Sequence, residues 1–251
     1  MKPGTILNRL HEYIEPLAGK RRIADLRVGL SYVGVKLDND AAGLAAVLPD
    51  MTIRGCTVLP DAGTYAGSSA VNTLKYLIHG KDSLHLAIGL AIANSLTELP
   101  VNSAENLEAT TYLNLQPGEK VAMVGFFAPL VERIRSTGAD LTIIEKNPQR
   151  LELLSQEKKQ QALQDCNVAI ITATTLLNNT FEETIDLLGK PRTVALIGPS
   201  TPLAPAIFYD TPITHLGGVV VNNPLRMLQI ISEGGGTPAL RPYLRFVNLF
   251  L

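Results

Sequence analysis

The sequence predicts an α/β protein in which a parallel sheet with helices on both faces follows a small α+β unit. From Pro117 onwards, short apolar runs alternate with helical segments, a pattern typical of parallel strands joined by helical crossovers. Before that point, a predicted hairpin is followed by helices, as in α+β units. The turn signal Pro117-Gly118 separates the two patterns. We therefore predict a small α+β domain over residues 1–116 and a Rossmann-like domain over residues 117–251.

The first unit is expected to open with an amphipathic helix, because Ile6, Leu10 and Ile14 recur at helical spacing within residues 5–17. Two β-compatible runs, at 25–37 and 43–48, flank a turn-forming Asp-Asn-Asp cluster, which predicts an antiparallel hairpin. Three further helices are expected, each after a residue that can cap it. They begin after Ser68 or Ser69, at Asp82 and running to Leu96, and after Asn102 or Ser103 towards Tyr112.

The second unit is expected to alternate strands and helices to the end of the chain. Its predicted strands are rich in β-branched residues and nearly continuously apolar. These strands are Lys120–Val124, Asp140–Ile144, Val168–Thr172, Thr193–Ile197 and His215–Val221. The predicted helices between them are Leu130–Thr137, Gln149–Gln164 and Thr180–Leu188, with a less regular segment from Pro202 to Tyr209 and a closing helix from about Asn223.

Composition narrows the classes of function. The chain of 251 residues has a formal net charge of -1, which argues against a nucleic-acid partner held by clustered Lys and Arg. Its longest apolar stretch, Leu84 to Leu96, contains His85 and Asn94 and is shorter than the ~18 residues of a membrane span. Two widely separated cysteines fit a reducing compartment. We expect a soluble cytoplasmic protein that binds neither nucleic acid nor membrane.

The predicted sheet places the candidate chemistry, because ligands bind beyond the carboxyl ends of such strands. The loops expected there carry hydroxyls, amides and prolines with one carboxylate. They are Gly125-Phe126-Phe127-Ala128-Pro129, Ile144-Glu145-Lys146-Asn147-Pro148, Thr172-Ala173-Thr174-Thr175 followed by Asn178 and Asn179, and Gly198-Pro199-Ser200-Thr201-Pro202.

Glu145 lies twenty residues after Gly125, close to where a nucleotide-binding fold keeps an acid for a ribose diol. This spacing favours a nucleoside ligand, although Glu145 could equally serve only to solvate the end of a strand. Phe127 occupies the place at which a second glycine would let the backbone approach a pyrophosphate, so a dinucleotide is disfavoured. Phe126 and Phe127 either pack beneath a neighbouring domain or form an apolar wall of the crevice.

Catalytic and metal signals are weak. Ser200 lacks the Gly-x-Ser-x-Gly elbow of a nucleophile, so a loop hydroxyl that binds a ligand or caps a turn is the better interpretation. The four histidines show no His-x-x-x-His pairing, and we assign no metal ligand, cofactor or catalytic residue. If a metal is handled, hard oxygen ligands such as Glu145, or a metal already held in an organic chelate, fit better than a Cys or His cage.

Taken together, five motifs of the second unit resemble a bacterial and archaeal family called the putative heavy-metal chelation domain. They are Val-Gly-Phe-Phe-Ala-Pro-Leu-Val, Ile-Glu-Lys-Asn-Pro, Ile-Thr-Ala-Thr-Thr-Leu-Leu-Asn-Asn-Thr, Leu-Ile-Gly-Pro-Ser-Thr-Pro-Leu and Gly-Gly-Gly-Thr, in that order. The first unit, with its hairpin and its Ala-Ile-Gly-Leu-Ala-Ile-Ala-Asn-Ser-Leu helix, is similar to the enolase-N-terminal-like domain that accompanies this family. The resemblance implies two domains with a site at their junction.

Carried over to this chain, the resemblance implies a ligand-binding site with several walls. One wall would be Gly125, Phe126, Phe127 and Pro129; others would be Glu145 with Asn147, and Thr172, Thr174 and Thr175 with Asn178; Gly198, Pro199, Ser200 and Thr201 would form the floor, with Asn94 facing the cleft. We expect a protein that binds a small molecule or a metal chelate. The alternatives are a nucleoside-using enzyme, such as one similar to S-adenosylmethionine-dependent methyltransferases, and a structural protein that forms homo-oligomers.

Overall fold

A computed structural model describes residues 1–48, 57–99, 104–105 and 109–251 of the chain. The strands are β1 (Ile23–Val28), β2 (Tyr32–Leu37), β3 (Ala42–Ala46), β4 (Ala104–Glu105), β5 (Lys120–Val124), β6 (Asp140–Ile144), β7 (Val168–Thr172), β8 (Thr193–Ile197), β9 (His215–Val221) and β10 (Leu244–Phe250). The α-helices are α1 (Thr5–Ala18), α2 (Ala70–Leu74), α3 (Tyr76–His79), α4 (Ser83–Leu96), α5 (Ala109–Tyr112), α6 (Ala128–Ser136), α7 (Gln156–Asp165), α8 (Thr174–Leu177), α9 (Phe181–Asp186), α10 (Pro224–Ser232) and α11 (Thr237–Leu240). Two 3₁₀ helices are η1 (Pro205–Phe208) and η2 (Arg241–Tyr243).

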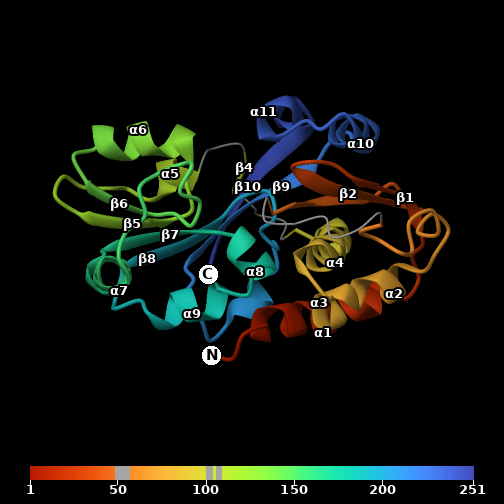
Figure 1. The fold of residues 1–251 in the computed structure, drawn as a ribbon, viewed down its shortest axis with the longest axis horizontal. Coiled ribbons are helices and arrows are strands. Elements are labelled where there is room, and N and C mark those ends of the chain that lie inside the picture. Colours follow the sequence, from red (N-terminus) through yellow and green to blue (C-terminus); the bar gives the residue numbers. More distant parts are fainter. Residues whose placement is uncertain (49–56, 100–103, 106–108) are drawn as a thin grey trace.

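The larger sheet is mostly parallel. Within the described residues it has seven strands in the order β4-β10-β9-β8-β7-β5-β6 (Figure 1). Strands β5 to β9 run parallel, whereas β10 and β4 are antiparallel additions at one edge. This is the predicted α/β architecture, and all five predicted strands begin and end at the predicted residues.

Alternating residues of the central strands point to opposite faces of this sheet, as the pleat requires. Val121 and Met123 of β5 belong to a core cluster that also contains Ile134 of α6. Ala122, between them, belongs to the cluster that contains Leu163 of α7. Figure 1 accordingly shows α6 on one side of the sheet and α7, α8 and α9 on the other. Both faces are covered, which explains why the strands read as nearly continuous apolar runs.

The smaller sheet consists, in the described part of the chain, of three antiparallel strands in the order β1-β2-β3. Helix α4 packs against β2 and β3 and is apolar on most sides because most of its residues are buried. Its first turn is capped by Asp82, whose Oδ1 accepts the backbone N–H groups of Leu84 and His85. Helix α10 also packs against this sheet, with Met227 and Ile231 sharing a core cluster with Tyr32 and Leu44.

The two parts of the chain share one continuous core. A single cluster of buried side chains runs from Ile6 of α1 to Leu249 of β10. Near the start of the chain, the backbone N–H of Ile6 donates to the buried carboxylate of Glu182 in α9 at 3.1 Å. Strand β4 precedes the predicted boundary, yet Ala104 pairs with Asn248 of β10 in the larger sheet. The division at residues 116 and 117 stays a prediction.

Several predicted elements were wrong in detail. The apolar run 25–37 is two strands rather than one, because a tight turn closed by the Gly29 N–H and the Tyr32 carbonyl at 2.9 Å interrupts it. Helix α7 begins at Gln156 rather than at Gln149, since Ser155 is its N-cap and accepts the Lys158 N–H at 3.4 Å. Asn102 and Ser103 lie outside the described residues, and a strand, β4, occupies part of the helix predicted after them.

Across the segments that the structure describes, no helix combines the length and the hydropathy needed to cross a membrane.

Candidate functional site

The candidate site lies where the strand order of the larger sheet reverses. Strand β5 sits between β6 and β7, so the chain leaves β5 towards one side and returns, after β6, on the other. The loops that follow β5 and β7 therefore diverge, and in sheets of this kind ligands bind in a crevice beyond such carboxyl ends. We call the region beyond the carboxyl ends of β5, β7 and β8 the crevice.

Gly125 forms the turn after β5 and requires a glycine for two reasons. Its φ of +90° lies in the left-handed region, which side chains disfavour. A Cβ atom at this position would lie 2.8 Å from Cγ2 of Thr172. The Gly125 N–H donates to the Ile144 carbonyl at 2.9 Å, so this turn contacts the ends of both neighbouring strands.

Phe126 and Phe127 are partly buried and pack against the core cluster beneath α6. Phe127 is the N-cap position of α6, and no side chain caps this helix. Pro129 stands in the first turn of α6, where its missing N–H has no cost, and it is exposed. The two phenylalanines thus pack against a cluster that includes side chains of β5, β7 and α6, and a role as a wall of the site stays a prediction.

Glu145 follows β6, and its carboxylate closes its own loop. Oε1 accepts the backbone N–H groups of Lys146 at 2.7 Å and Asn147 at 3.0 Å. Oε2 lies 3.8 Å from Nη1 of Arg150, and the Glu145 side chain is only 10% exposed. Asn147 in turn accepts the Gln149 N–H at 2.9 Å. Both side chains shape the loop, and among the described residues Glu145 Oε2 has only this long ionic contact.

The loop after β7 carries a pair of hydroxyls. Thr172 Oγ1 and Thr174 Oγ1 lie 3.0 Å apart, and both residues are half-buried. Thr175 is buried and donates its hydroxyl to the Thr172 carbonyl at 2.7 Å, so it stabilises the turn. Asn178 lies beyond α8, is exposed, and accepts the Thr180 hydroxyl at 2.6 Å. The structure therefore brings Thr172 and Thr174 to the strand end and leaves Asn178 outside this hydroxyl pair.

The loop after β8 joins the two parts of the chain. Its backbone turns tightly at Gly198, which has a φ of +124°, and half-buried Pro199 follows. Ser200 is 2% exposed, and its hydroxyl accepts the Ala46 N–H of β3 at 2.8 Å. Asn94 of α4 donates from Nδ2 to the carbonyls of Leu44 at 3.0 Å and Ser200 at 3.4 Å. Ser200 thus binds the end of β3 instead of capping a turn of its own loop, and a role in ligand binding stays a prediction.

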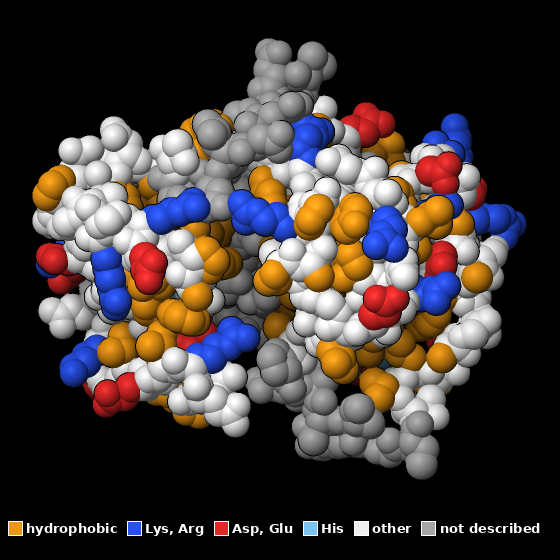
Figure 2. Space-filling view, turned by 90° about the horizontal axis from the view of Figure 1, so that it is seen from above, with side chains coloured by type: hydrophobic (Ala, Val, Ile, Leu, Met, Phe, Trp, Pro, Cys, Tyr) orange, Lys and Arg blue, Asp and Glu red, His pale blue; other side chains and the backbone are white. Residues whose placement is uncertain are grey.

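These loops lie side by side. Ala173 donates its N–H to the Ile197 carbonyl at 2.9 Å, which joins the end of β7 to the end of β8, while Gly125 contacts Thr172. Seen from above, Lys and Arg side chains lie along the facing edges of the part that carries α6 and the part that carries α10 and α11 (Figure 2).

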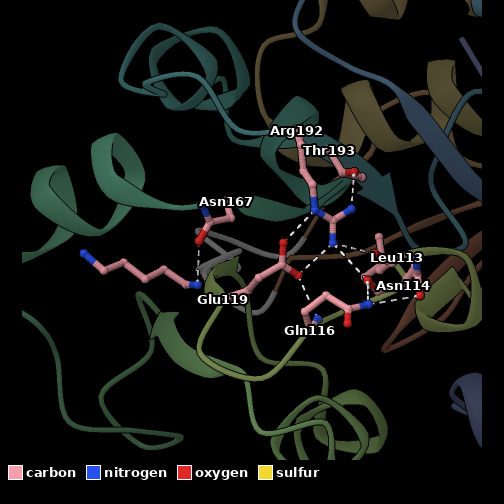
Figure 3. Close-up of polar contacts among 8 residues, drawn as sticks. Leu113, Asn114, Gln116, Glu119, Asn167, Arg192 and Thr193 are labelled. Atoms are coloured by element: carbon pink, nitrogen blue, oxygen red, sulfur yellow. Dashed lines mark hydrogen bonds and ion pairs between the residues drawn. The ribbon is translucent and has the colours of Figure 1, made fainter.

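Sequence reasoning missed a polar cluster at the opposite edge of the sheet, where β5 and β8 begin (Figure 3). Arg192 donates to both carboxylate oxygens of Glu119, at 2.7 and 2.8 Å, and to the Leu113 carbonyl at 2.9 Å. The hydrogen bond from Arg192 lowers the pKa of Glu119 to about 2. Because the cluster lies away from the crevice, its role is structural, and a separation of 73 residues left no local signal for it.

Metal-binding side chains are sparse. Among the described residues, no three of His, Cys, Asp or Glu lie close enough together to hold a metal ion. His215 is buried at the amino end of β9, where its Nε2 lies 2.8 Å from Asn248 Oδ1. Cys166 is buried just before β7, and burial raises the pKa of its thiol. The crevice itself offers hard oxygen atoms from hydroxyl, amide and carboxylate groups.

Comparisons with known proteins agree on a family. A family model described as "Putative heavy-metal chelation" (DUF364) matches residues 108–250, and a second model with the same description (DUF4213) matches residues 11–97. An uncharacterised protein of Methanocaldococcus jannaschii is 27% identical over 145 residues, which are 56% of this chain and 56% of that protein. The chain therefore spans just over half the length of this curated relative.

Two solved structures share the fold. A DUF364 protein of unknown function from Pyrococcus horikoshii has a TM-score of 0.83 and 19% identity, with 98% of this chain and 100% of that chain covered. Another, from Desulfitobacterium hafniense, has a TM-score of 0.81 and 20% identity, with 98% of each chain covered. At such identities the likeness extends to the fold alone.

Proposed function

This chain belongs to the DUF364 family, and from that premise we propose that it binds a metal chelate in the crevice beyond the carboxyl ends of β5, β7 and β8. The resemblance implies a cleft between a Rossmann-like domain and an enolase-N-terminal-like companion, and we propose that the crevice is this cleft.

The observation that carries the proposal is the contact between Gly125 and Thr172 at the switch point. A glycine with positive φ and no room for a Cβ keeps the two diverging loops close together. The backbone of the β5 turn and the Thr172–Thr174 hydroxyl pair are thereby held at one strand edge. Preorganised polar groups beside a partly apolar surface are the usual composition of a small-molecule site.

A chelate fits the residues better than a bare ion. Within the part of the chain that the structure describes, no cluster of Cys, His or carboxylates could saturate a metal, whereas hydroxyl and amide oxygens suit the organic periphery of a complex. The Lys and Arg side chains on the facing edges of the two parts in Figure 2 suit a complex that carries negative charge. Glu145 Oε2, whose one contact with a described residue is the long one to Arg150, is a carboxylate oxygen that could join the metal shell.

Isothermal titration calorimetry tests the proposal with nickel(II) ions and the nickel(II) complex of iminodiacetate. We expect wild type to bind the complex more tightly than the free ion. Thr174→Val and Glu145→Gln should weaken binding by tenfold or more, since the first removes a hydroxyl and the second removes a negative charge while the shape of each side chain is kept. Thr137→Val is the matched control, because its half-buried hydroxyl lies at the far end of α6. Equal affinity in all four proteins would contradict the proposed site.

A second candidate is a nucleoside-using enzyme, similar to S-adenosylmethionine-dependent methyltransferases. It is favoured by the place of Glu145, which follows the strand next to β5 beside the Gly125 turn, as an acid that binds a ribose diol would. It is disfavoured by the two backbone N–H groups that already occupy Oε1.

Thermal-shift measurements with millimolar S-adenosylmethionine, NAD and adenosine separate the two candidates. A rise in melting temperature that Glu145→Gln abolishes would support the nucleoside enzyme. No rise with any of the three would leave the chelate proposal as the better account. A cytoplasmic location and a homo-oligomeric state stay predictions.

A further inference from the structure

Two oxygen atoms at the junction of the two parts of the chain are buried without a hydrogen bond. Asn94 Oδ1 comes from α4 and Thr201 Oγ1 from the loop after β8, and neither has a partner among the residues that the structure describes. An unpaired buried polar atom loses its water and gains nothing in return, which is unfavourable for folding. Each such atom in a folded protein calls for an explanation, and a bound group is one of those that proteins provide.

The orientation of the Asn94 amide follows from its hydrogen bonds. Its nitrogen faces the carbonyl oxygens of Leu44 and Ser200, and a carbonyl can only accept. In a flipped amide, Oδ1 would face the two carbonyl oxygens, and three acceptors would lie together without a donor. The assignment of Nδ2 and Oδ1 is therefore secure. Oδ1 is therefore an acceptor in need of an N–H or O–H donor.

The relevant polar group of Thr201 is its side-chain hydroxyl. The residue is 2% exposed, and its backbone N–H already donates to the Gly198 carbonyl at 3.0 Å. Valine has the same shape without the hydroxyl, so packing alone does not demand threonine here. The Ser200 carbonyl, which accepts from Asn94, belongs to the peptide bond that joins Ser200 to Thr201, and this places the two unpaired oxygens in one neighbourhood.

This neighbourhood adjoins the strand ends that border the crevice. The loop after β8 is joined to the end of β7 through the Ala173 N–H and the Ile197 carbonyl, and β7 contacts the Gly125 turn after β5. Two strand spacings of ~4.8 Å each separate β8 from β5, so one ligand of about 10 Å could reach from the turn to the junction.

We propose that Asn94 Oδ1 and Thr201 Oγ1 form the anchor for a hydrogen-bond-donating group, an N–H or O–H, on the organic part of the ligand in the crevice. The inference rests on the proposed function and adds the chemistry of one end of the ligand. It also gives the junction a role in selection, because a ligand without such a donor leaves both oxygens unpaired.

The first arm of the test measures stability without ligand. Thr201→Val removes a hydroxyl that makes no bond within the described protein, so its melting temperature should equal or exceed that of wild type. Thr184→Val is the matched control, because the buried Thr184 hydroxyl donates to the Thr180 carbonyl at 2.7 Å and its loss should lower the melting temperature. A fall in Thr201→Val as large as that in Thr184→Val would mean that water or protein already satisfies Thr201, and would overturn the inference.

The second arm compares two probes that differ in a single donor, the nickel(II) complexes of iminodiacetate, which has an N–H, and of N-methyliminodiacetate, which has none. Wild type and Thr184→Val should prefer the N–H complex by tenfold or more in calorimetry. Thr201→Val should bind both complexes with equal affinity.

The outcomes separate this inference from the proposed function. Binding of both complexes with no preference in wild type, or a preference that survives in Thr201→Val, overturns the anchor alone. If wild type binds neither complex, the proposed function fails and the anchor fails with it. Tighter binding of free nickel(II) than of either complex would indicate that the two oxygens bind a hard cation and not an organic donor. That result would also overturn the inference.

Discussion

At the scale of single residues, Gly125 determines how closely the loops of the crevice approach one another. Two separate constraints act on it, the left-handed backbone and the methyl group of Thr172. Gly118 shares only the first, because its φ is +78° but a Cβ there would meet nothing within 4 Å. A comparison of the same substitution at Gly125 and at Gly118 therefore distinguishes backbone strain from steric contact.

We predict that Gly125→Ala lowers the free energy of unfolding by about 1–3 kcal/mol more than Gly118→Ala does. Both substitutions cost the ~1–2 kcal/mol of a left-handed side chain, and only the first also forces a Cβ against Thr172, as in an overpacked core. Urea denaturation measures the two losses.

Thr172→Ser supplies the control for this prediction. It removes the Cγ2 atom, which would lie 2.8 Å from a Cβ at position 125, and keeps the hydroxyl that pairs with Thr174. In the double variant, part of the loss caused by Gly125→Ala should be recovered. Equal losses for Gly125→Ala and Gly118→Ala would refute a steric role for Thr172.

At the scale of elements, different interactions stabilise the carboxyl ends and the amino ends of the strands in the larger sheet. The carboxyl ends of the strands meet in loops that carry hydroxyls, while the amino ends of β5 and β8 are tied by Glu119 and Arg192 (Figure 3). The guanidinium also binds the Leu113 carbonyl, so the segment that leads into the sheet is held by the same group. Two parallel bonds to a carboxylate make this the geometry in which an ion pair contributes most.

We predict a pH-dependent contribution of this pair to stability. The pKa of Glu119 falls to about 2 in the folded chain, so its contribution is complete above the unfolded pKa and is lost as pH falls towards the folded value. The difference in free energy of unfolding between wild type and Glu119→Gln should be constant from pH 5 to 8, at about 1 kcal/mol because Arg192 is partly exposed, and should shrink between pH 5 and 3. Urea denaturation over this range measures it.

Arg192→Gln serves as the background control. In a chain that carries Arg192→Gln, the further change Glu119→Gln should have a much smaller effect and little pH dependence, because the partner that lowers the pKa is gone. An unchanged pH dependence in that background would show that Arg192 is not its cause.

Elements were predictable where the signal is local. The strands from β5 to β9 begin and end at the predicted residues, because a buried parallel strand is a short apolar run bounded by turn residues. The helix predicted from Gln149 failed at its start, since the cap at Ser155 outweighed the weaker periodicity before it. The prediction of one strand over 25–37 was wrong because the tight turn at Gly29, which joins two strands, does not interrupt the β-compatible pattern of the sequence.

At the scale of the whole molecule, the two parts behave as one packing unit. One core cluster contains side chains from α1, α4, β7 and β10, and Ser200 and Asn94 add hydrogen bonds across the junction. A ligand at the crevice would therefore touch a region whose geometry depends on both parts.

We predict that the chain unfolds in a single transition, because neither part can expose its share of the common core without destabilising the other. Differential scanning calorimetry should give equal calorimetric and van't Hoff enthalpies. Ser200→Ala leaves the Ala46 N–H without its acceptor. It should lower the free energy of unfolding by about 1–2 kcal/mol and shift this transition to a lower temperature. It should not split the transition, and two separate transitions in wild type would contradict the prediction.

The sequence by itself determined the fold class, the strands of the parallel sheet and the loops at their carboxyl ends, since apolar periodicity and turn residues act over a few neighbouring positions. Only the tertiary structure decided which loop residues meet. Asn94 and Ser200 are 106 residues apart, and Glu119 and Arg192 are 73 apart. Such pairs form because the strand order brings distant segments together, and a strand order is an outcome of packing the whole sheet, which no local pattern encodes.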